Sequence, residues 1–177
     1  MRLKILIFSA IIIFANLFVV ADCATWSHPE KIKVYIPPND PKTITAKRAF
    51  AEWSRKTQDR FVFYYIQNKK LADIEIIFLE KQTKCGDRAL ACTLYSGHSK
   101  HIEHAVIYMA KYTNDKTNRK IGKNEYYTAF LHEIGHAIGL DHNNNKASIM
   151  YPMEDDKQEI LNSDIKTLYK LYGMKTH

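Results

Sequence analysis

The chain has 177 residues, of which 46% are hydrophobic and only 6 are glycine and 5 proline, so its composition is that of a globular protein. It contains no internal repeat and no low-complexity tract, which excludes a repeat architecture and a disordered chain. The formal net charge is +7, but the lysines are scattered instead of forming a basic stripe interleaved with aromatic residues. We therefore predict no nucleic-acid partner.

The first residues have the pattern of a secretory signal peptide. Two basic residues precede an apolar run over residues 5–20, and small residues lead up to Ala21. We predict cleavage after Ala21, which makes residues 1–21 the signal peptide and residues 22–177 one secreted domain without stable membrane association. An uncleaved membrane anchor is the alternative, although the run is short for a membrane span.

The first half of the remaining chain predicts alternating strands and a helix. Alternation of apolar and polar residues predicts a strand over residues 31–36. Thr43 is expected to cap a helix whose apolar face carries Ala46, Ala49, Phe50, Trp53 and Thr57. Further strands are predicted over residues 61–66, 73–79, 89–95 and 105–110, with residues 89–95 at the sheet edge. This order of elements indicates an α/β layer fold.

The cysteines favour an oxidising compartment. Cys85 and Cys92 bracket a short turn, and we predict that they form a disulfide, with two free buried thiols as the alternative. Cys23 directly follows the predicted cleavage site. Lipid attachment to Cys23 would anchor the protein, but Asp22 precedes it where a small residue is expected. A free N-terminal thiol is the simpler interpretation, and contact with a metal in a latent form is a further alternative.

A second group of histidines lies between the last two predicted strands. His98, His101 and His104 are spaced H-x-x-H-x-x-H, which invites a second metal site. We interpret them instead as polar loop residues. The next segment, residues 111–123, is polar and is expected to be a surface loop before a helix capped by Asn124.

The most informative segment of the chain is residues 132–142, which read H-E-x-x-H-x-x-G-x-x-H. On a helix, His132 and His136 lie one turn apart on the same face and direct both imidazoles at one point. Gly139 stands where the chain must leave the helix and reverse, since glycine adopts a positive φ at little cost. After that reversal His142 can return as a third metal ligand.

This set of side chains predicts a catalytic zinc site. Three neutral imidazoles leave one coordination position open for water, whereas a structural zinc site is closed by a fourth protein ligand. Zinc lowers the pKa of that water to about 7. Glu133 is then placed to act as the general base and to pass the proton to the leaving amine. After the motif, Met150 stands where such sites carry a methionine-containing turn, and a last helix is expected from Ser163 to Gly173.

These residues resemble the metzincin metallopeptidases and, within them, the matrixins. The zinc motif and Met150 carry the resemblance, together with three segments that are similar to the family's first helix, third strand and C-terminal helix. These segments are residues 49–54, 72–78 and 161–173, so the similarity covers roughly residues 30–173.

The resemblance implies a fold and roles for particular residues. The expected fold is α/β, a twisted and mostly parallel five-stranded sheet with three helices and a zinc cleft between a large upper and a small lower lobe. His132, His136 and His142 would be the zinc ligands, and Met150 would form the hydrophobic floor beneath the metal. Tyr151, Pro152 and Met153 would form the wall of the substrate pocket. Calcium is also found in the family, but we assign no residue to it.

Three departures from the family pattern stand out. Asn143 follows the third histidine, where matrixins usually have serine, and no counterpart is found of the long propeptide whose cysteine caps the zinc in animal members. Tyr151 directly follows Met150, one residue before the metal-binding tyrosine of astacin-type enzymes, so we do not predict it as a ligand.

The sequence therefore predicts a secreted, monomeric zinc endopeptidase that cleaves internal bonds of protein or peptide substrates. One alternative is a catalytically silent binding module on the same fold. Another is a zinc hydrolase with a narrow, non-peptide substrate.

Overall fold

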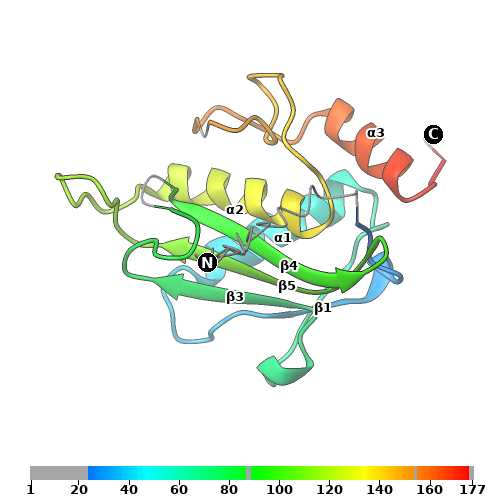
Figure 1. Cartoon of the computed structure of the whole chain (residues 1–177), viewed down its shortest axis with the longest axis horizontal. Coiled ribbons are helices and arrows are strands. Elements are labelled where there is room, and N and C mark those ends of the chain that lie inside the picture. The colour runs from blue at the N-terminus through cyan, green and yellow to red at the C-terminus, as the bar shows by residue number, and fades with distance from the viewer. Residues whose placement is uncertain (1–23, 87–88, 154, 176–177) are drawn as a thin grey trace, which may run out of the picture.

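The computed structural model describes residues 24–86, 89–153 and 155–175, which form a sheet with helices packed on one face (Figure 1). The predicted signal peptide and Cys23 lie outside the described residues. No helix in the described part of the chain is both long and apolar enough to cross a membrane.

The sheet has five strands in the order β2-β1-β3-β5-β4. Every neighbouring pair is parallel except β4 and β5, which are antiparallel. Because β4 is last in the strand order, it forms one edge of the sheet. This arrangement confirms the predicted mostly parallel five-stranded sheet. The strands are β1 (Ile32–Tyr35), β2 (Phe63–Tyr65), β3 (Ile74–Leu79), β4 (Ala91–His98) and β5 (His101–Ala110).

Three α-helices complete the fold: α1 (Thr43–Lys56), α2 (Lys123–Ala137) and α3 (Asn162–Leu171). Short 3-10 turns at Pro29–Lys31 and Lys69–Leu71 precede β1 and β3. In Figure 1, α1 and α2 lie against the sheet, and the chain after α2 forms a smaller part that ends in α3. The carboxyl end of α2 therefore lies between a large and a small lobe, as the fold class requires.

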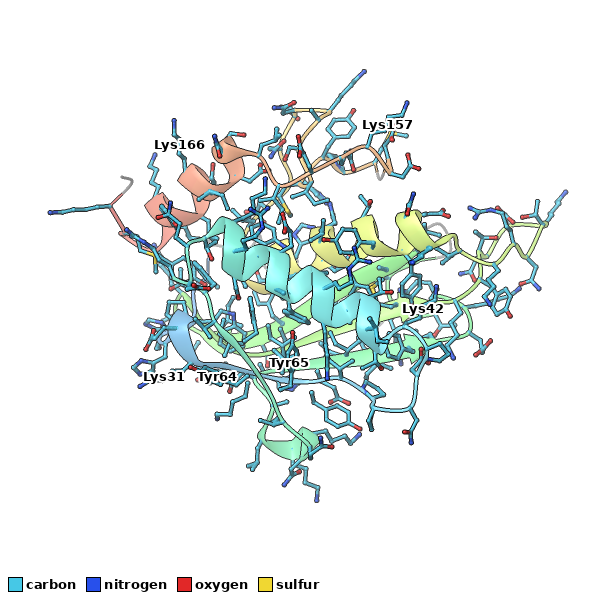
Figure 2. The ribbon with its side chains drawn as sticks, turned by 180° about the vertical axis from the view of Figure 1, so that it is seen from behind. Lys31, Lys42, Tyr64, Tyr65, Lys157 and Lys166 are labelled. Carbon is cyan, nitrogen blue, oxygen red and sulfur yellow. A yellow bond between two sulfur atoms is a disulfide. The ribbon has the colours of Figure 1, made fainter. Side chains whose placement is uncertain are left out.

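The core lies between the sheet and the first two helices. The apolar face predicted for α1 is buried, and the indole Nε1 of Trp53 donates a hydrogen bond to the carbonyl of Leu131 on α2, 2.9 Å away. Figure 2 views the molecule from behind, where α1 crosses the sheet and the exposed Tyr64 and Tyr65 lie on β2. Because Trp53 links α1 to α2, the first helix fixes the position of the second.

In all three helices the N-cap residue lies one or two positions before the predicted cap. Thr43 is the first residue of α1, and its hydroxyl donates to the carbonyl of Pro37. The N-cap of α2 is Gly122 instead of Asn124, and the N-cap of α3 is Leu161 instead of Ser163. In both cases a carboxylate three residues later accepts the N–H of the N-cap residue, a bond that satisfies one orphan donor.

The hairpin formed by β4 and β5 is longer than predicted. β4 continues to His98 and β5 begins at His101, and these two residues are paired in the ladder. His104 also lies in β5, opposite Ser96. The interpretation of these histidines as loop residues is therefore wrong, because the ladder extends almost to the turn.

The two ends of the described chain meet at the carboxyl end of α2. The Trp26 indole Nε1 donates to the carbonyl of Ala137 at 2.8 Å. The Tyr172 hydroxyl donates to the carbonyl of Ile138 at 2.9 Å and accepts the N–H of Trp26 at 3.1 Å. Segments from both ends of the sequence thus satisfy the last carbonyls of the helix that carries His132 and His136.

Candidate metal centre

Three histidine side chains meet at the carboxyl end of α2. The Nε2 atoms of His132 and His136 are 3.0 Å apart, and each lies 3.1 Å from Nε2 of His142. His132 and His136 come from successive turns of α2, and His142 comes from the segment that follows it. The structure thus brings together all three histidines that the sequence singled out.

The hydrogen bonds of the other ring nitrogens decide the tautomer. Nδ1 of His132 lies 2.6 Å from the carbonyl of Ile149, and Nδ1 of His136 lies 2.8 Å from the carbonyl of Leu140. A carbonyl can only accept, so both Nδ1 atoms carry the proton and both Nε2 atoms of the neutral rings present lone pairs. Lone pairs at such distances repel one another unless a cation lies between them. This donor set therefore fits a metal ion such as zinc.

Burial keeps these imidazoles neutral. Desolvation lowers the pKa of His132 to about 4 and that of His136 to about 3. The pKa of His142 is also lowered, again mainly by desolvation. All three rings are thus unprotonated at neutral pH, which is the form that binds metals.

A tight turn after α2 returns the chain to the site. Gly139 has φ of +100°, a conformation that side-chain-bearing residues rarely adopt. A Cβ atom added there would lie 2.3 Å from the carbonyl oxygen of Ala24. Gly139 is therefore required both by its backbone conformation and by the close approach of the N-terminal segment, and the predicted chain reversal occurs at this residue.

Met150 packs against the helix turn between the first two histidines. A Cβ added to Gly135 would lie 2.3 Å from Sδ of Met150 and 3.2 Å from the ring of Trp53. Met150 is buried, and the residue before it, Ile149, supplies the carbonyl that orients His132. The sequence pattern drew attention to Met150, but the need for glycine at position 135 was not predicted.

A buried polar network fixes the segment that carries Met150. The Asn143 side-chain amide donates to Ser148 Oγ at 2.8 Å and to Asp164 Oδ1 at 3.0 Å. The backbone N–H of Asn143 donates to the carbonyl of Met150. Asn143, noted above as a departure from the family pattern, is therefore a structural residue that joins the third histidine to the methionine turn.

Glu133 is buried beside the histidines, with 4% of its surface exposed. The hydroxyl of Thr93, on the edge strand β4, lies 2.6 Å from Glu133 Oε2 and 2.9 Å from the Glu133 carbonyl. Thr93 was not singled out from the sequence, because it lies 40 residues away from Glu133 and in no recognisable motif.

The histidines and Glu133 lie in an open cleft of about 1000 Å³ between β4 and the segment after α2. Of the residues predicted to form the pocket wall, Pro152 and Met153 line this cleft, whereas Tyr151 is not among its lining residues. Met153 is 72% exposed, so it is available for contact with a bound molecule. The cleft also extends along β4 to Tyr95.

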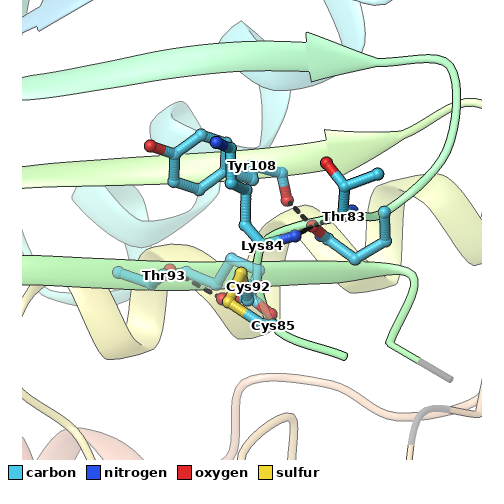
Figure 3. Close-up of a disulfide and its surroundings, with 8 residues drawn as sticks. Thr83, Lys84, Cys85, Cys92, Thr93 and Tyr108 are labelled. Atoms are coloured by element: carbon cyan, nitrogen blue, oxygen red, sulfur yellow. Dashed lines mark hydrogen bonds between the residues drawn. A yellow bond between two sulfur atoms is a disulfide. The ribbon is translucent and has the colours of Figure 1, made fainter. Parts of the chain in front are cut away.

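One rim of the cleft is linked covalently to the loop before it. Cys85 and Cys92 form a disulfide with a Cα–Cα distance of 6.1 Å. Figure 3 shows this bond next to Thr93. Both cysteines line the cleft. The bond therefore attaches the preceding loop to the amino-terminal half of the edge strand.

Within the described residues, His132, His136 and His142 form the one group of three or more histidine, cysteine or acidic side chains whose ligand atoms are close enough to hold an ion. His98, His101 and His104 do not form such a group. His98 instead contacts Glu103, with 2.9 Å between Nδ1 and Oε1.

Comparison with known proteins agrees with this geometry. The sequence model of the matrixin family matches residues 25–173. Matrix metalloproteinase-16 of Rattus norvegicus is 28% identical over 170 residues, covering 84% of this chain and 27% of the relative. Matrix metalloproteinase-26 of Homo sapiens is 29% identical over 168 residues, covering 86% of this chain and 61% of the relative. Karilysin of Tannerella forsythia is 27% identical over 159 residues, covering 80% of this chain and 32% of the relative.

The three converging histidines, the sheet topology and the extent of the match define a metallopeptidase fold. The chain belongs to the matrixin family. It spans about a quarter to three fifths of the length of these three relatives. Two of these relatives are named as matrix metalloproteinases.

Proposed function

We propose that this protein is a secreted zinc endopeptidase in which His132, His136 and His142 bind the metal and Glu133 is the general base. The observation that carries the proposal is the convergence of three histidine Nε2 atoms beside a buried carboxylate in an open cleft. Zinc held by three imidazoles supplies a Lewis acid and lowers the pKa of a coordinated water to about 7.

Other groups of the site orient the histidine rings and transfer the proton. The carbonyls of Ile149 and Leu140 hold the rings of His132 and His136 in the orientation that directs Nε2 inward. Glu133 takes a proton from the attacking water and delivers it to the nitrogen of the leaving amine. Since neither step forms a covalent bond to the protein, no nucleophilic side chain is required.

The edge strand supports an extended peptide as the substrate. β4 is the last strand of the sheet, and its residues Leu94 and Tyr95 are 49% and 39% exposed. A second groove runs along the same strand from Thr93 to His98. A substrate segment can add to such an edge by main-chain hydrogen bonds, which would place a peptide bond near the metal. Pro152 and Met153, which line the cleft, would contact the side chain that follows the cleaved bond, and Tyr151 is proposed for the same wall from the family resemblance.

Secretion is part of the proposal. It is supported by the sequence pattern of residues 1–21 and by the disulfide between Cys85 and Cys92, since disulfides persist in oxidising compartments. Detection of the protein in the culture medium, with an N-terminus at Asp22, would test this directly.

The activity is tested with a quenched-fluorescent peptide library and the purified protein. We expect cleavage that a chelator abolishes and added zinc restores. Glu133→Gln should reduce kcat/KM at least 100-fold while retaining bound zinc, because only the proton transfer is removed. Glu30→Gln, a matched change on the surface outside the cleft, should leave cleavage unchanged.

Two results would contradict the proposal. Zinc-loaded protein that cleaves no peptide in the library would favour a binding module or a narrow, non-peptide substrate. Cleavage that Glu133→Gln leaves intact would exclude Glu133 as the general base.

A further inference from the structure

The carboxylate of Glu133 is tied to a residue of the edge strand. The Thr93 hydroxyl is 2.6 Å from Glu133 Oε2, a short distance typical of a hydroxyl that donates to a carboxylate. The Glu133 carbonyl, at 2.9 Å, is the more distant acceptor. A hydroxyl has a single proton, so the closer oxygen, Glu133 Oε2, receives it.

This contact restrains the carboxylate in a particular way. The Thr93 oxygen touches both the side chain and the main chain of Glu133, so it fixes the carboxylate relative to the turn of α2 that carries it. The opposite end of the contact is also restrained, because Thr93 is paired with Ile107 in the ladder and follows the disulfide-bonded Cys92 (Figure 3). The hydroxyl therefore belongs to a rigid strand.

The bond from Thr93 matters because the Glu133 carboxylate is buried. Glu133 is only 4% exposed, and a buried carboxylate needs polar partners in place of water. General-base catalysis also requires the carboxylate within hydrogen-bond distance of the proton that it abstracts, and small displacements reduce the rate strongly. Because Thr93 binds Oε2, it restrains the orientation of the carboxylate within the site.

We propose that Thr93 is a positioning residue of this site, whose hydroxyl orients the Glu133 carboxylate for proton transfer. The inference rests on the proposed role of Glu133 and adds to it a residue from the edge strand. Thr93 thereby couples the strand along which a substrate would bind to the group that acts on it.

The test compares Thr93→Val, which keeps the shape but loses the hydroxyl, with Thr93→Ser, which retains the hydroxyl. We expect Thr93→Val to lower kcat roughly tenfold with KM changed by less than about twofold, and Thr93→Ser to keep most of the activity. Thr167→Val removes a hydrogen-bonded hydroxyl from the surface of α3 and should have no effect. Zinc content and melting temperature are measured for all variants.

A second readout does not depend on activity. The carboxyl carbon resonance of Glu133, identified by its absence in Glu133→Gln, is recorded by ¹³C NMR in protein labelled at glutamate. We expect it to move in Thr93→Val and to match the wild type in Thr93→Ser and Thr167→Val. This spectrum tests the positioning of Glu133 even if the wild type cleaves no peptide, so the two proposals can fail separately.

The inference is overturned if the Glu133 resonance is unchanged in Thr93→Val, or if Thr93→Val retains the kcat of an active wild type. It is also overturned if Thr93→Ser behaves like Thr93→Val, since the hydroxyl would then not be the determining group. A fall in zinc content or melting temperature that parallels the loss of activity would assign Thr93 a structural role instead.

Discussion

The hydroxyl of Ser148 donates to Oδ1 of Asp164 at 2.7 Å, which joins the methionine turn to the first turn of α3. Asp164 is 2% exposed, and its other oxygen accepts the N–H of Leu161. The same Oδ1 accepts from the side chain of Asn143. One buried carboxylate therefore connects the segment after the third histidine, the methionine turn and the C-terminal helix.

Replacing that carboxylate should destabilise the protein strongly. Asp164→Ala would remove the acceptor of three donors, of which Ser148 is buried and Asn143 and Leu161 are partly buried, and we expect the free energy of unfolding to fall by about 3 kcal/mol. Urea unfolding measures the change, with the exposed Asp156→Ala as the control. A loss below about 1 kcal/mol would show that the network contributes little.

The turn at Gly139 gives a second prediction. Gly139→Ala would combine backbone strain at φ of +100° with a clash against the Ala24 carbonyl. We therefore expect the free energy of unfolding to fall by more than about 3 kcal/mol and zinc binding to weaken. Gly86 has φ of +94°, but no atom lies within 4 Å of a Cβ added there. Gly86→Ala therefore measures the backbone strain alone, and we expect it to lower the free energy of unfolding by about 1 kcal/mol. Equal losses in the two variants would exclude the clash.

Two buried tyrosines test the cost of an unpaired hydroxyl. Within the described residues the Tyr126 hydroxyl is buried without a hydrogen-bond partner, whereas the Tyr169 hydroxyl donates to the Thr57 carbonyl at 2.8 Å. We expect Tyr126→Phe to change the free energy of unfolding by less than about 0.5 kcal/mol and Tyr169→Phe to lower it by about 1 kcal/mol. Thermal or urea unfolding of both variants checks the difference, and the reverse order would contradict it.

The start of α2 should make stability depend on pH. The side chain of Arg119 and the N–H of Gly122 both bond to the Glu125 carboxylate, and the Arg119 bond is the main cause that lowers its pKa from the ordinary 4.5. A carboxyl whose folded pKa is lowered contributes fully above its unfolded pKa, and the contribution disappears as the pH falls through the folded pKa.

Glu125→Gln should therefore cost about 1 kcal/mol at pH 7, a modest value because the pair is partly exposed to solvent. The difference from the wild type should shrink when unfolding is measured near pH 3. Glu159→Gln, an exposed glutamate outside this cap, serves as the control. A difference that does not depend on pH would contradict the role of charge.

The sequence predicted the parts of the site that depend on local geometry. His132 and His136 lie together because helix periodicity brings residues four apart onto one face, and the glycine at 139 was expected from the required reversal. The first strand was predicted from alternation and the next two from runs of apolar, aromatic and branched residues, although β2 is shorter and β4 and β5 are longer than expected. Their ends depend on pairing with a neighbour, which a single segment does not contain.

The remaining parts depend on residues distant in sequence. Thr93 reaches Glu133 across 40 positions, and Trp26 reaches Ala137 across 111. The helix caps were misplaced because Gly122 and Leu161 have no capping side chain. The signal there was the acidic residue three positions later, Glu125 or Asp164, whose carboxylate supplies the bond.

The disulfide between Cys85 and Cys92 has a practical consequence for producing the protein. The two cysteines have a sequence separation of only 7, so the bond restricts the unfolded chain only modestly. We expect it to contribute about 2 kcal/mol to the free energy of unfolding. Material made in a reducing cytoplasm should therefore fold and retain its histidines in place, yet carry a looser cleft rim, so host strains that oxidise thiols are the appropriate choice for kinetic work.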